Sequence, residues 1–170
     1  MWRRISSPNT LPAPNSKKTF SRAALARLLS RRGKKKVVFA NGCFDLLHAG
    51  HIKLLEKAKS SGDILVVALN SDGSVRRLKG AGRPLVGEKQ RAQALAGLEA
   101  VDFVTVFKED TPLEAIRQLK PDILVKGADY KISDIVGAGL VKKVVRIPLV
   151  KGISTSTIVK KILDAYGRKS

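Results

Sequence analysis

Two histidines three residues apart are the residues best suited to chemistry in this sequence. His48 and His51 are the only histidines of the chain, and Gly50 lies between them. They follow an apolar run at residues 37–40, typical of a buried parallel strand, and they open a pattern typical of a helix. Free N–H groups and the positive dipole end of such a helix attract anions, and a glycine lets a phosphate approach the backbone closely. The pattern therefore predicts phosphate chemistry.

A second candidate lies near the end of the chain. Residues 152–157 read GISTST, and they open the last expected helix. Ser154, Thr155 and Ser156 would lie at its N-terminus, where hydroxyls and backbone N–H groups can bind phosphate oxygens. Ordinary N-capping explains one hydroxyl, but three hydroxyls after a glycine exceed what a cap requires.

Cations follow the second expected strand. Residues 74–84 are predicted to form a basic, glycine-punctuated loop that contains Arg76, Arg77, Lys79 and Arg83. Anion binding and a solvated basic loop are both open for these residues, and Lys79 is the strongest candidate for anion binding.

Other site classes fit less well. A zinc site lacks further histidines, and the single cysteine, Cys43, is a poor supplement. We expect Cys43 to be a small packing residue near the turn. A serine hydrolase is disfavoured because no G-x-S-x-G motif occurs. The segment GRPLVGEK resembles a phosphate-binding loop, but Glu88 stands where that motif requires lysine.

Alternating strand and helix patterns should position these groups. We expect Asn41 and Gly42 to end the first strand. The expected strands are residues 37–40, 63–69, 102–107, 123–125 and 141–149, and the expected helices after the first include 88–98, 111–119 and 154–166. This alternation predicts a doubly wound, Rossmann-like α/β fold with a five-stranded parallel sheet. Ligands bind beyond the carboxyl ends of the strands in such a sheet, so the candidate residues should meet at one edge.

Composition indicates one domain with a basic leader. The net charge is +19, and residues 1–36 hold 11 of the 33 Lys and Arg without any Asp or Glu. We expect a leader at residues 1–35, partly disordered, with a short helix from Arg22 to about Ser30 that Ser21 caps. A transit peptide, a nucleic-acid-binding arm and a solvated leader whose helix packs on the domain are the alternatives. Residues 36–170 would form the domain. A single cysteine fits a reducing compartment, and no apolar run reaches the ~18 residues of a membrane span.

A family resemblance adds to this interpretation. GCFDLLHAGH at residues 42–51 and GISTST resemble the HxGH and ISTxT signatures of the cytidylyltransferase-like nucleotidyltransferases. With LNSDGSVRRLKGAGRP, EDTPLEAI and PDILVKGADY, they resemble the D-glycero-β-D-manno-heptose 1-phosphate adenylyltransferase family. The resemblance covers about residues 36–165. It implies the HxGH nucleotidyltransferase fold, transfer from ATP to a sugar 1-phosphate for lipopolysaccharide core biosynthesis, Mg²⁺ with the ATP, and a cytoplasmic location.

The resemblance also implies site roles. His48, His51 and Lys79 would be catalytic. Asp45 and Arg83 would bind the sugar substrate, with Asp45 facing the sugar hydroxyls. The nucleotide would be bound by Gly42, Cys43, Phe44, Gly50, Lys126, Gly127, Asp129, Gly152, Ser154, Thr155 and Ser156.

Two rival functions remain open. Glycerol-3-phosphate cytidylyltransferase is the rival within the same chemistry, although the arginine that opens the equivalent RTEG segment of those enzymes is missing before Gly152. A basic nucleic-acid-binding module is the rival of another class, and the low aromatic content of 5% counts against it. We expect no membrane insertion, and a homodimer is compatible with the sequence.

Overall fold

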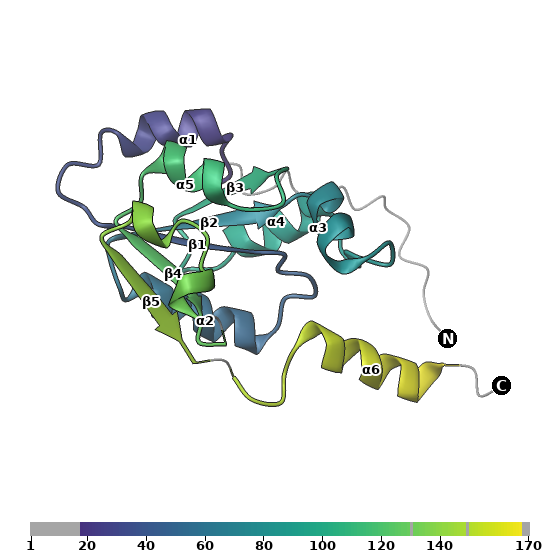
Figure 1. Ribbon diagram of the computed structural model, residues 1–170. Coiled ribbons are helices and arrows are strands. Elements are labelled where there is room, and N and C mark those ends of the chain that lie inside the picture. The colour runs from purple at the N-terminus through teal and green to yellow at the C-terminus, as the bar shows by residue number, and fades with distance from the viewer. Residues whose placement is uncertain (1–17, 130, 149, 168–170) are drawn as a thin grey trace, which may run out of the picture.

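The structure is a computed structural model that describes residues 18–129, 131–148 and 150–167. Its five strands form one parallel sheet in the order β3-β2-β1-β4-β5 (Figure 1). The strands are β1 (Val37–Gly42), β2 (Ile64–Asn70), β3 (Phe103–Phe107), β4 (Ile123–Gly127) and β5 (Lys143–Ile147). The α-helices are α1 (Arg22–Leu29), α2 (Ala49–Lys59), α3 (Asp72–Lys79), α4 (Glu88–Ala96), α5 (Leu113–Leu119) and α6 (Thr155–Tyr166). Two short 3₁₀ helices, η1 (Ile132–Asp134) and η2 (Ala138–Leu140), precede β5.

Helices cover both faces of the sheet. Side chains along β1 alternate between the two faces: Val38 and Ala40 belong to one apolar cluster, and Val37 and Phe39 to the other. α2 and α4 supply the first cluster, and α1 and α5 supply the second (Figure 1). The predicted doubly wound α/β fold with a five-stranded parallel sheet is therefore confirmed.

The strand order reverses at β1, which pairs with β2 on one side and β4 on the other. In open parallel sheets, such a reversal leaves a crevice beyond the carboxyl ends of the strands, where ligands bind. The segments that follow β1 and β4 begin at this crevice.

Two expectations about local structure were wrong. Asn41 and Gly42 do not break the first strand, because both belong to β1 and continue its pairing with β2, opposite Ala68 and Leu69; Gly42 is its last residue. The expected loop at residues 74–84 is largely helical, since α3 occupies Asp72–Lys79. The residues that resemble a turn are its cap: the Ser71 side chain accepts a hydrogen bond from the Ser74 N–H.

The leader contributes a helix to the core. Ser21 caps α1 as expected, and Leu25 and Leu29 are buried in the cluster beneath α5. Just before this helix, Thr19 pairs with Val104 at the edge of the sheet. Residues 1–17 of the predicted leader lie outside the described residues, and the domain boundary after residue 35 stays a prediction.

α6 differs from the other helices. It extends away from the layered body (Figure 1), and none of its residues is buried. Ile162, Leu163 and Tyr166 are among the exposed apolar side chains. Among the described residues, no helix has both the length and the apolar character to cross a bilayer.

Candidate active site

The two histidines lie side by side where α2 begins. His48 is the N-cap of α2, and its Nδ1 accepts a hydrogen bond from the Gly50 N–H at 3.1 Å. The two imidazole rings are stacked, with centroids 3.8 Å apart and an interplanar angle of 21°. The rings of Phe44 and His51 meet edge to face, with centroids 5.3 Å apart. Because Nδ1 of neutral His48 accepts, its proton lies on Nε2, which can donate to a ligand oxygen.

Both imidazoles favour the neutral form. The pKa of His51 is lowered to about 4, mainly by burial and also by the neighbouring His48, against the opposing effect of Asp45. Burial also lowers the pKa of His48. The Nδ1 atom of His51 is buried and has no hydrogen-bond partner among the described residues. At neutral pH the pair therefore offers two uncharged imidazoles, which donate hydrogen bonds without the charge of an imidazolium.

The histidine segment and the GISTST segment meet, although about a hundred residues separate them. The Thr155 hydroxyl donates to the backbone oxygen of Asp45 at 2.7 Å. A Cβ on Gly50 would lie 3.0 Å from ring atoms of His48 and 3.4 Å from Ile153. Glycine at position 50 thus lets the imidazole and the GISTST segment approach each other.

The three hydroxyls of the second segment have different surroundings. Ser154 is the N-cap of α6 and shares a capping box with Thr157, so the ordinary capping role applies to Ser154. Thr155 contacts the backbone of Asp45, as described above. Ser156 is exposed. Gly152 has φ +79°, a left-handed conformation that favours glycine and turns the chain into α6.

Cys43 lies near three cations, of which Lys79 and Arg83 were predicted for the site. Burial raises the pKa of its thiol, and Lys79, Arg91 and Arg83 oppose that rise. Lys79 is the last residue of α3 and is exposed. Burial outweighs these cations, so the thiol at the end of β1 stays protonated more readily than a free cysteine.

The segments that form this site also match a known protein family. Residues 39–161, which include most of β1, both histidines and the start of α6, match the family model described as cytidylyltransferase-like. The chain belongs to the cytidylyltransferase-like family. The HxGH and ISTxT signatures of this cytidylyltransferase-like chain are the two segments that the fold brings together.

Relatives of this cytidylyltransferase-like chain include longer proteins. It is 59% identical over 141 residues to bifunctional protein HldE of Campylobacter curvus. The aligned region covers 83% of this chain and 30% of the relative. It is 58% identical over 148 residues to bifunctional protein HldE of Campylobacter jejuni subsp. jejuni. That aligned region covers 87% of this chain and 32% of the relative. The chain thus spans about a third of the length of these relatives.

Solved structures agree on the fold. A lipopolysaccharide core biosynthesis protein from Thermoplasma volcanium is 33% identical, with a TM-score of 0.60, over 69% of this chain and 99% of that one. A pantoate-beta-alanine ligase from Francisella tularensis has a TM-score of 0.57, over 86% of this chain and 78% of that one. At 19% identity, the second likeness shows the fold alone.

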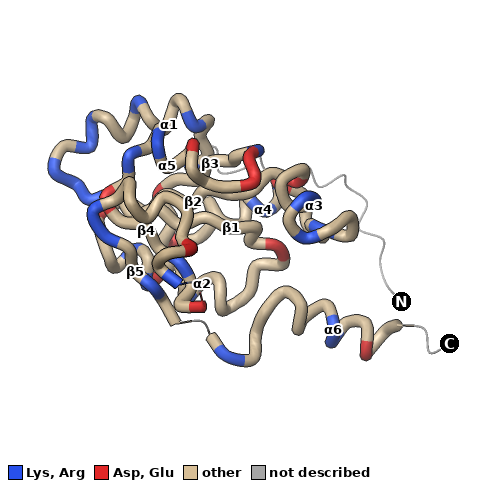
Figure 2. The backbone as a smooth tube through the Cα atoms, viewed as in Figure 1, with Lys and Arg blue, Asp and Glu red and all other residues tan. Residues whose placement is uncertain are grey.

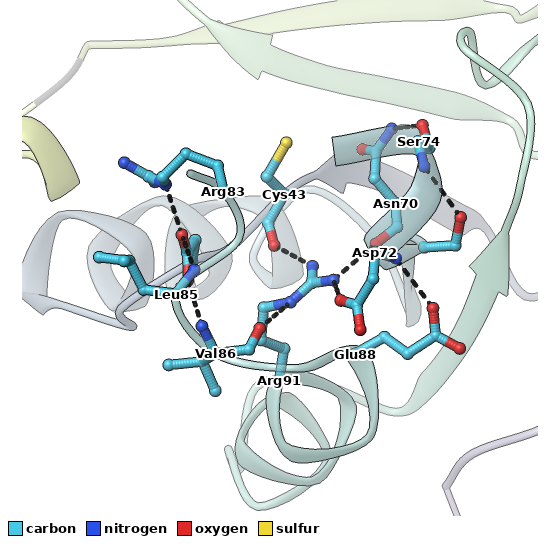
Figure 3. Close-up of polar contacts among 11 residues, drawn as sticks. Cys43, Asn70, Asp72, Ser74, Arg83, Leu85, Val86, Glu88 and Arg91 are labelled. Carbon is cyan, nitrogen blue, oxygen red and sulfur yellow. Dashed lines mark hydrogen bonds and ion pairs between the residues drawn. The ribbon is translucent and has the colours of Figure 1, made fainter. Parts of the chain in front are cut away.

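Asp45 and Arg83, both predicted to bind the sugar substrate, contact each other. Arg83 Nε lies 2.7 Å from an oxygen of the buried Asp45 carboxylate. The backbone N–H groups of Leu85 and Val86 donate to the same carboxylate at 2.9 and 3.0 Å (Figure 3). Burial alone would raise the pKa of Asp45, but these three donors outweigh it and hold that pKa below its usual value. Asp45 therefore fixes the loop that carries Arg83.

Asp45 points inward because the backbone on either side of it is unusual. Phe44 and Leu46 have φ values of +46° and +49°, in the left-handed region that few non-glycine residues adopt. Gly42 assists, since a Cβ there would lie 3.2 Å from the Phe44 ring. Two such residues around one buried carboxylate indicate a turn that the surrounding contacts determine.

Sequence reasoning missed Arg91. This buried arginine of α4 donates to the backbone oxygens of three residues, Cys43, Asn70 and Val86, and to the Asp72 carboxylate at 2.7 Å (Figure 3). It thereby joins the ends of β1 and β2 to the start of α3. A signal was present: Arg91 falls on the apolar stripe of its helix with Leu95, four residues later, and a charge on such a stripe is unusual.

The predicted nucleoside-side residues follow β4. Lys126 is partly buried, and burial lowers its pKa against the opposing charges of Asp129 and Cys43. Gly127 ends β4 and is buried, whereas Asp129 is exposed. These residues share the carboxyl edge of the sheet with the histidines, and their roles in binding stay predictions.

Proposed function

We propose that this chain joins ATP and D-glycero-β-D-manno-heptose 1-phosphate to give ADP-heptose and pyrophosphate, a step that supplies lipopolysaccharide core biosynthesis in the cytoplasm. Membership of the cytidylyltransferase-like family supports nucleotidyl transfer. The sugar substrate is supported by the motif resemblance and by relatives named HldE and lipopolysaccharide core biosynthesis protein. The observation that carries the proposal is the meeting of His48 and His51 with the GISTST segment.

The proposed reaction is a single displacement at phosphorus. A phosphate oxygen of the sugar 1-phosphate attacks the α-phosphorus of ATP. The bond from the α-phosphorus to the oxygen that bridges to the β-phosphorus breaks, and that oxygen leaves with its electron pair as pyrophosphate. The nucleophile is already anionic, so catalysis consists mainly of positioning two polyanions and stabilising the charge that grows on their oxygens.

The two imidazoles would supply that stabilisation. In this proposal, His48 donates from Nε2, because its Nδ1 already accepts from the Gly50 N–H. His51 donates as a neutral ring at pH 7, since its pKa is about 4. A preorganised donor at such a centre contributes about 3–4 kcal/mol, more than the ~0.3–1 kcal/mol of the helix dipole.

The remaining groups would hold the substrates. Lys79 and Arg83 neutralise phosphate charge, and Ser154, Thr155, Ser156 and the N–H groups at the start of α6 bind the β- and γ-phosphates. Mg²⁺ enters with ATP as part of the substrate and is coordinated mainly by phosphate oxygens.

A substrate panel tests the proposal. ATP or CTP is paired with heptose 1-phosphate or with glycerol 3-phosphate, and pyrophosphate release is measured. The proposal expects turnover with ATP and heptose 1-phosphate well above the other three pairs. Preference for CTP and glycerol 3-phosphate would replace it with the cytidylyltransferase alternative.

Substitution of the histidines tests their role. We expect His48→Ala and His51→Ala each to lower turnover about 100-fold or more while the protein remains folded. Lys53→Ala, an exposed position on the same helix, is the matched control and should keep its activity. Turnover close to that of the wild type in either histidine variant would contradict the assigned role.

A further inference from the structure

Exposed cations gather at the edge of the sheet opposite the candidate active site. In a parallel α/β fold, the strand starts and the helix ends share one edge, and here both are basic. Figure 2 shows the blue segments on the turn after α1 and around the start of β5. The basic edge consists of the exposed residues Arg31, Lys34, Lys35, Lys36, Lys120, Lys142 and Lys143.

The acidic side chains beside these cations already have partners. Asp122 lies between the starts of β1 and β4 and accepts a hydrogen bond from the Val37 N–H at 3.0 Å. Its carboxylate also pairs with Arg32 at 3.4 Å and with Lys142 at 2.9 Å. Asp63 accepts from the backbone N–H of Lys36 at 2.7 Å. The two carboxylates therefore leave most of the positive charge of the basic edge uncompensated.

Helix ends explain only part of this charge. Arg31 and Lys120 follow the last turns of α1 and α5, where a cation complements the helix dipole. The cations at positions 34–36 precede β1, and those at 142–143 lie at the start of β5, where no helix end requires them. Like charges so close together repel one another, so their concentration points to an anionic partner.

Exposed leucines among the cations indicate which kind of polyanion fits. Leu28 is 44% exposed on α1, beside Arg27 and Arg31. Leu140 is 50% exposed and precedes Lys142 by two residues. Apolar side chains within a basic face suit the headgroup layer of an anionic bilayer, whereas single-stranded nucleic acid is bound by aromatic stacking. Among the described Phe and Tyr side chains, only Tyr166 is exposed, and it lies on α6 and not at the basic edge.

We propose that the basic edge binds the surface of a bilayer that contains anionic phospholipids, with Leu28 and Leu140 entering the headgroup layer. The carboxyl ends of the strands then face away from the lipid, so the candidate active site stays open to substrates. The proposal does not depend on the reaction, because it rests on the opposite edge of the sheet.

Vesicle co-sedimentation of the full chain tests the proposal. Vesicles contain phosphatidylcholine alone or phosphatidylcholine mixed with phosphatidylglycerol, at low and at high salt. We expect binding to the mixed vesicles only, and weaker binding at high salt. Equal binding to both kinds of vesicle would refute an electrostatic surface.

A matched pair of variants separates this surface from net charge. Lys34→Gln/Lys35→Gln/Lys143→Gln should weaken binding roughly 10- to 100-fold. Lys53→Gln/Lys160→Gln/Lys161→Gln removes the same charge from exposed positions on α2 and α6 and should leave binding within about twofold. Equal losses in both variants would show that net charge alone decides.

Two further measurements complete the test. Leu28→Ser/Leu140→Ser should weaken the binding that persists at high salt, and an unchanged residual binding would refute the insertion of the leucines. Fluorescence anisotropy with duplex and single-stranded oligonucleotides tests whether nucleic acid is the partner instead. Oligonucleotide binding that the first triple variant abolishes, with no binding to mixed vesicles, would assign the basic edge to nucleic acid.

Discussion

The two sides of the candidate site are held in very different ways. On one side, Arg91 and Asp45 bind the segments after β1 and β2 through buried hydrogen bonds, and both side chains are 1% exposed. On the other side, α6 has no buried residue. Its start is held against the body by the hydrogen bond of the Thr155 hydroxyl and by the approach of Ile153 to Gly50.

This difference separates two tasks. The histidines must be placed accurately before substrates arrive, because a preorganised donor gains its advantage from not having to reorganise. The hydroxyls of α6 have to meet a triphosphate that must also enter and leave, so a lightly attached arm suits them. Changes on the Arg91 side should therefore damage folding, whereas changes on the α6 side should damage substrate affinity.

Loss of Arg91 should have the largest effect. We expect Arg91→Met to lower the free energy of unfolding by about 3–5 kcal/mol, because three backbone oxygens and the Asp72 carboxylate lose a buried donor. Urea unfolding followed by circular dichroism measures the change. Arg91→Lys should fall in between, since an ammonium keeps the charge but cannot reproduce the guanidinium geometry.

Lys89→Met is the matched control for that experiment. Lys89 is exposed on the same helix, so its substitution should change the free energy of unfolding by less than about 0.5 kcal/mol. If Arg91→Met were as mild as this control, the buried contacts would not hold the two strand ends together.

The pH dependence of stability should report on His51. Its folded pKa of about 4 lies below the usual 6.5, so between these values the unfolded chain binds a proton that the folded chain does not. The free energy of unfolding is therefore highest above pH 6.5, falls as the pH drops toward 4, and levels off below that. The total fall is at most about 3 kcal/mol. Urea unfolding across this range, compared with His51→Gln, isolates the contribution. Parallel curves for the two proteins would contradict the burial of a neutral imidazole.

Substitution of Asp45 should change the free energy of unfolding less than substitution of Arg91 does. Its pH dependence should fall in a more acidic range than that of His51. We expect Asp45→Asn to lower the free energy of unfolding at pH 7 by about 1.5–3 kcal/mol, because an amide cannot accept all three donors of the 83–86 loop. The folded pKa of Asp45 is lowered, so its contribution is present above the unfolded value of 3.8 and is lost as pH falls through the folded value.

The difference between wild type and Asp45→Asn should accordingly shrink in acid. Asp110→Asn is the control, since the Asp110 side chain is 58% exposed in its ion pair with Arg77. A gap between wild type and Asp45→Asn that stayed constant down to pH 2 would mean that the carboxylate charge does not hold the loop.

The sequence predicted the α6 side of this comparison better than the Arg91 side. Strand patterns, the HxGH segment and the hydroxyl-rich helix start are local signals, and a parallel sheet brings its carboxyl ends to one edge. The meeting of His48 with the start of α6 follows from that topology. The stacking of the two imidazoles does not, because ring orientation depends on Phe44 and on the cap at Gly50.

The Arg91 side escaped prediction for a physical reason. Three acceptors of Arg91 are backbone oxygens, which every residue carries, so no residue type marks them in the sequence. α3 was missed because Ser71 and Asp72 serve equally well in a turn and in a helix cap, and tertiary context decides between them. Asp45 was expected to face the sugar, but two left-handed residues beside it direct its carboxylate to the 83–86 loop.

Thr155 should give the smallest change in stability and thereby sharpen the comparison. Thr155→Val keeps the side-chain volume and removes the hydroxyl that donates to the Asp45 backbone oxygen at 2.7 Å. Because α6 has no buried residue, we expect the free energy of unfolding to change by less than about 1 kcal/mol. The same loss of positioning should raise KM for ATP roughly fivefold while kcat changes less. Steady-state pyrophosphate release measures both constants, with the exposed Thr111→Val as control. An unchanged KM would mean that the start of α6 takes no part in holding the triphosphate.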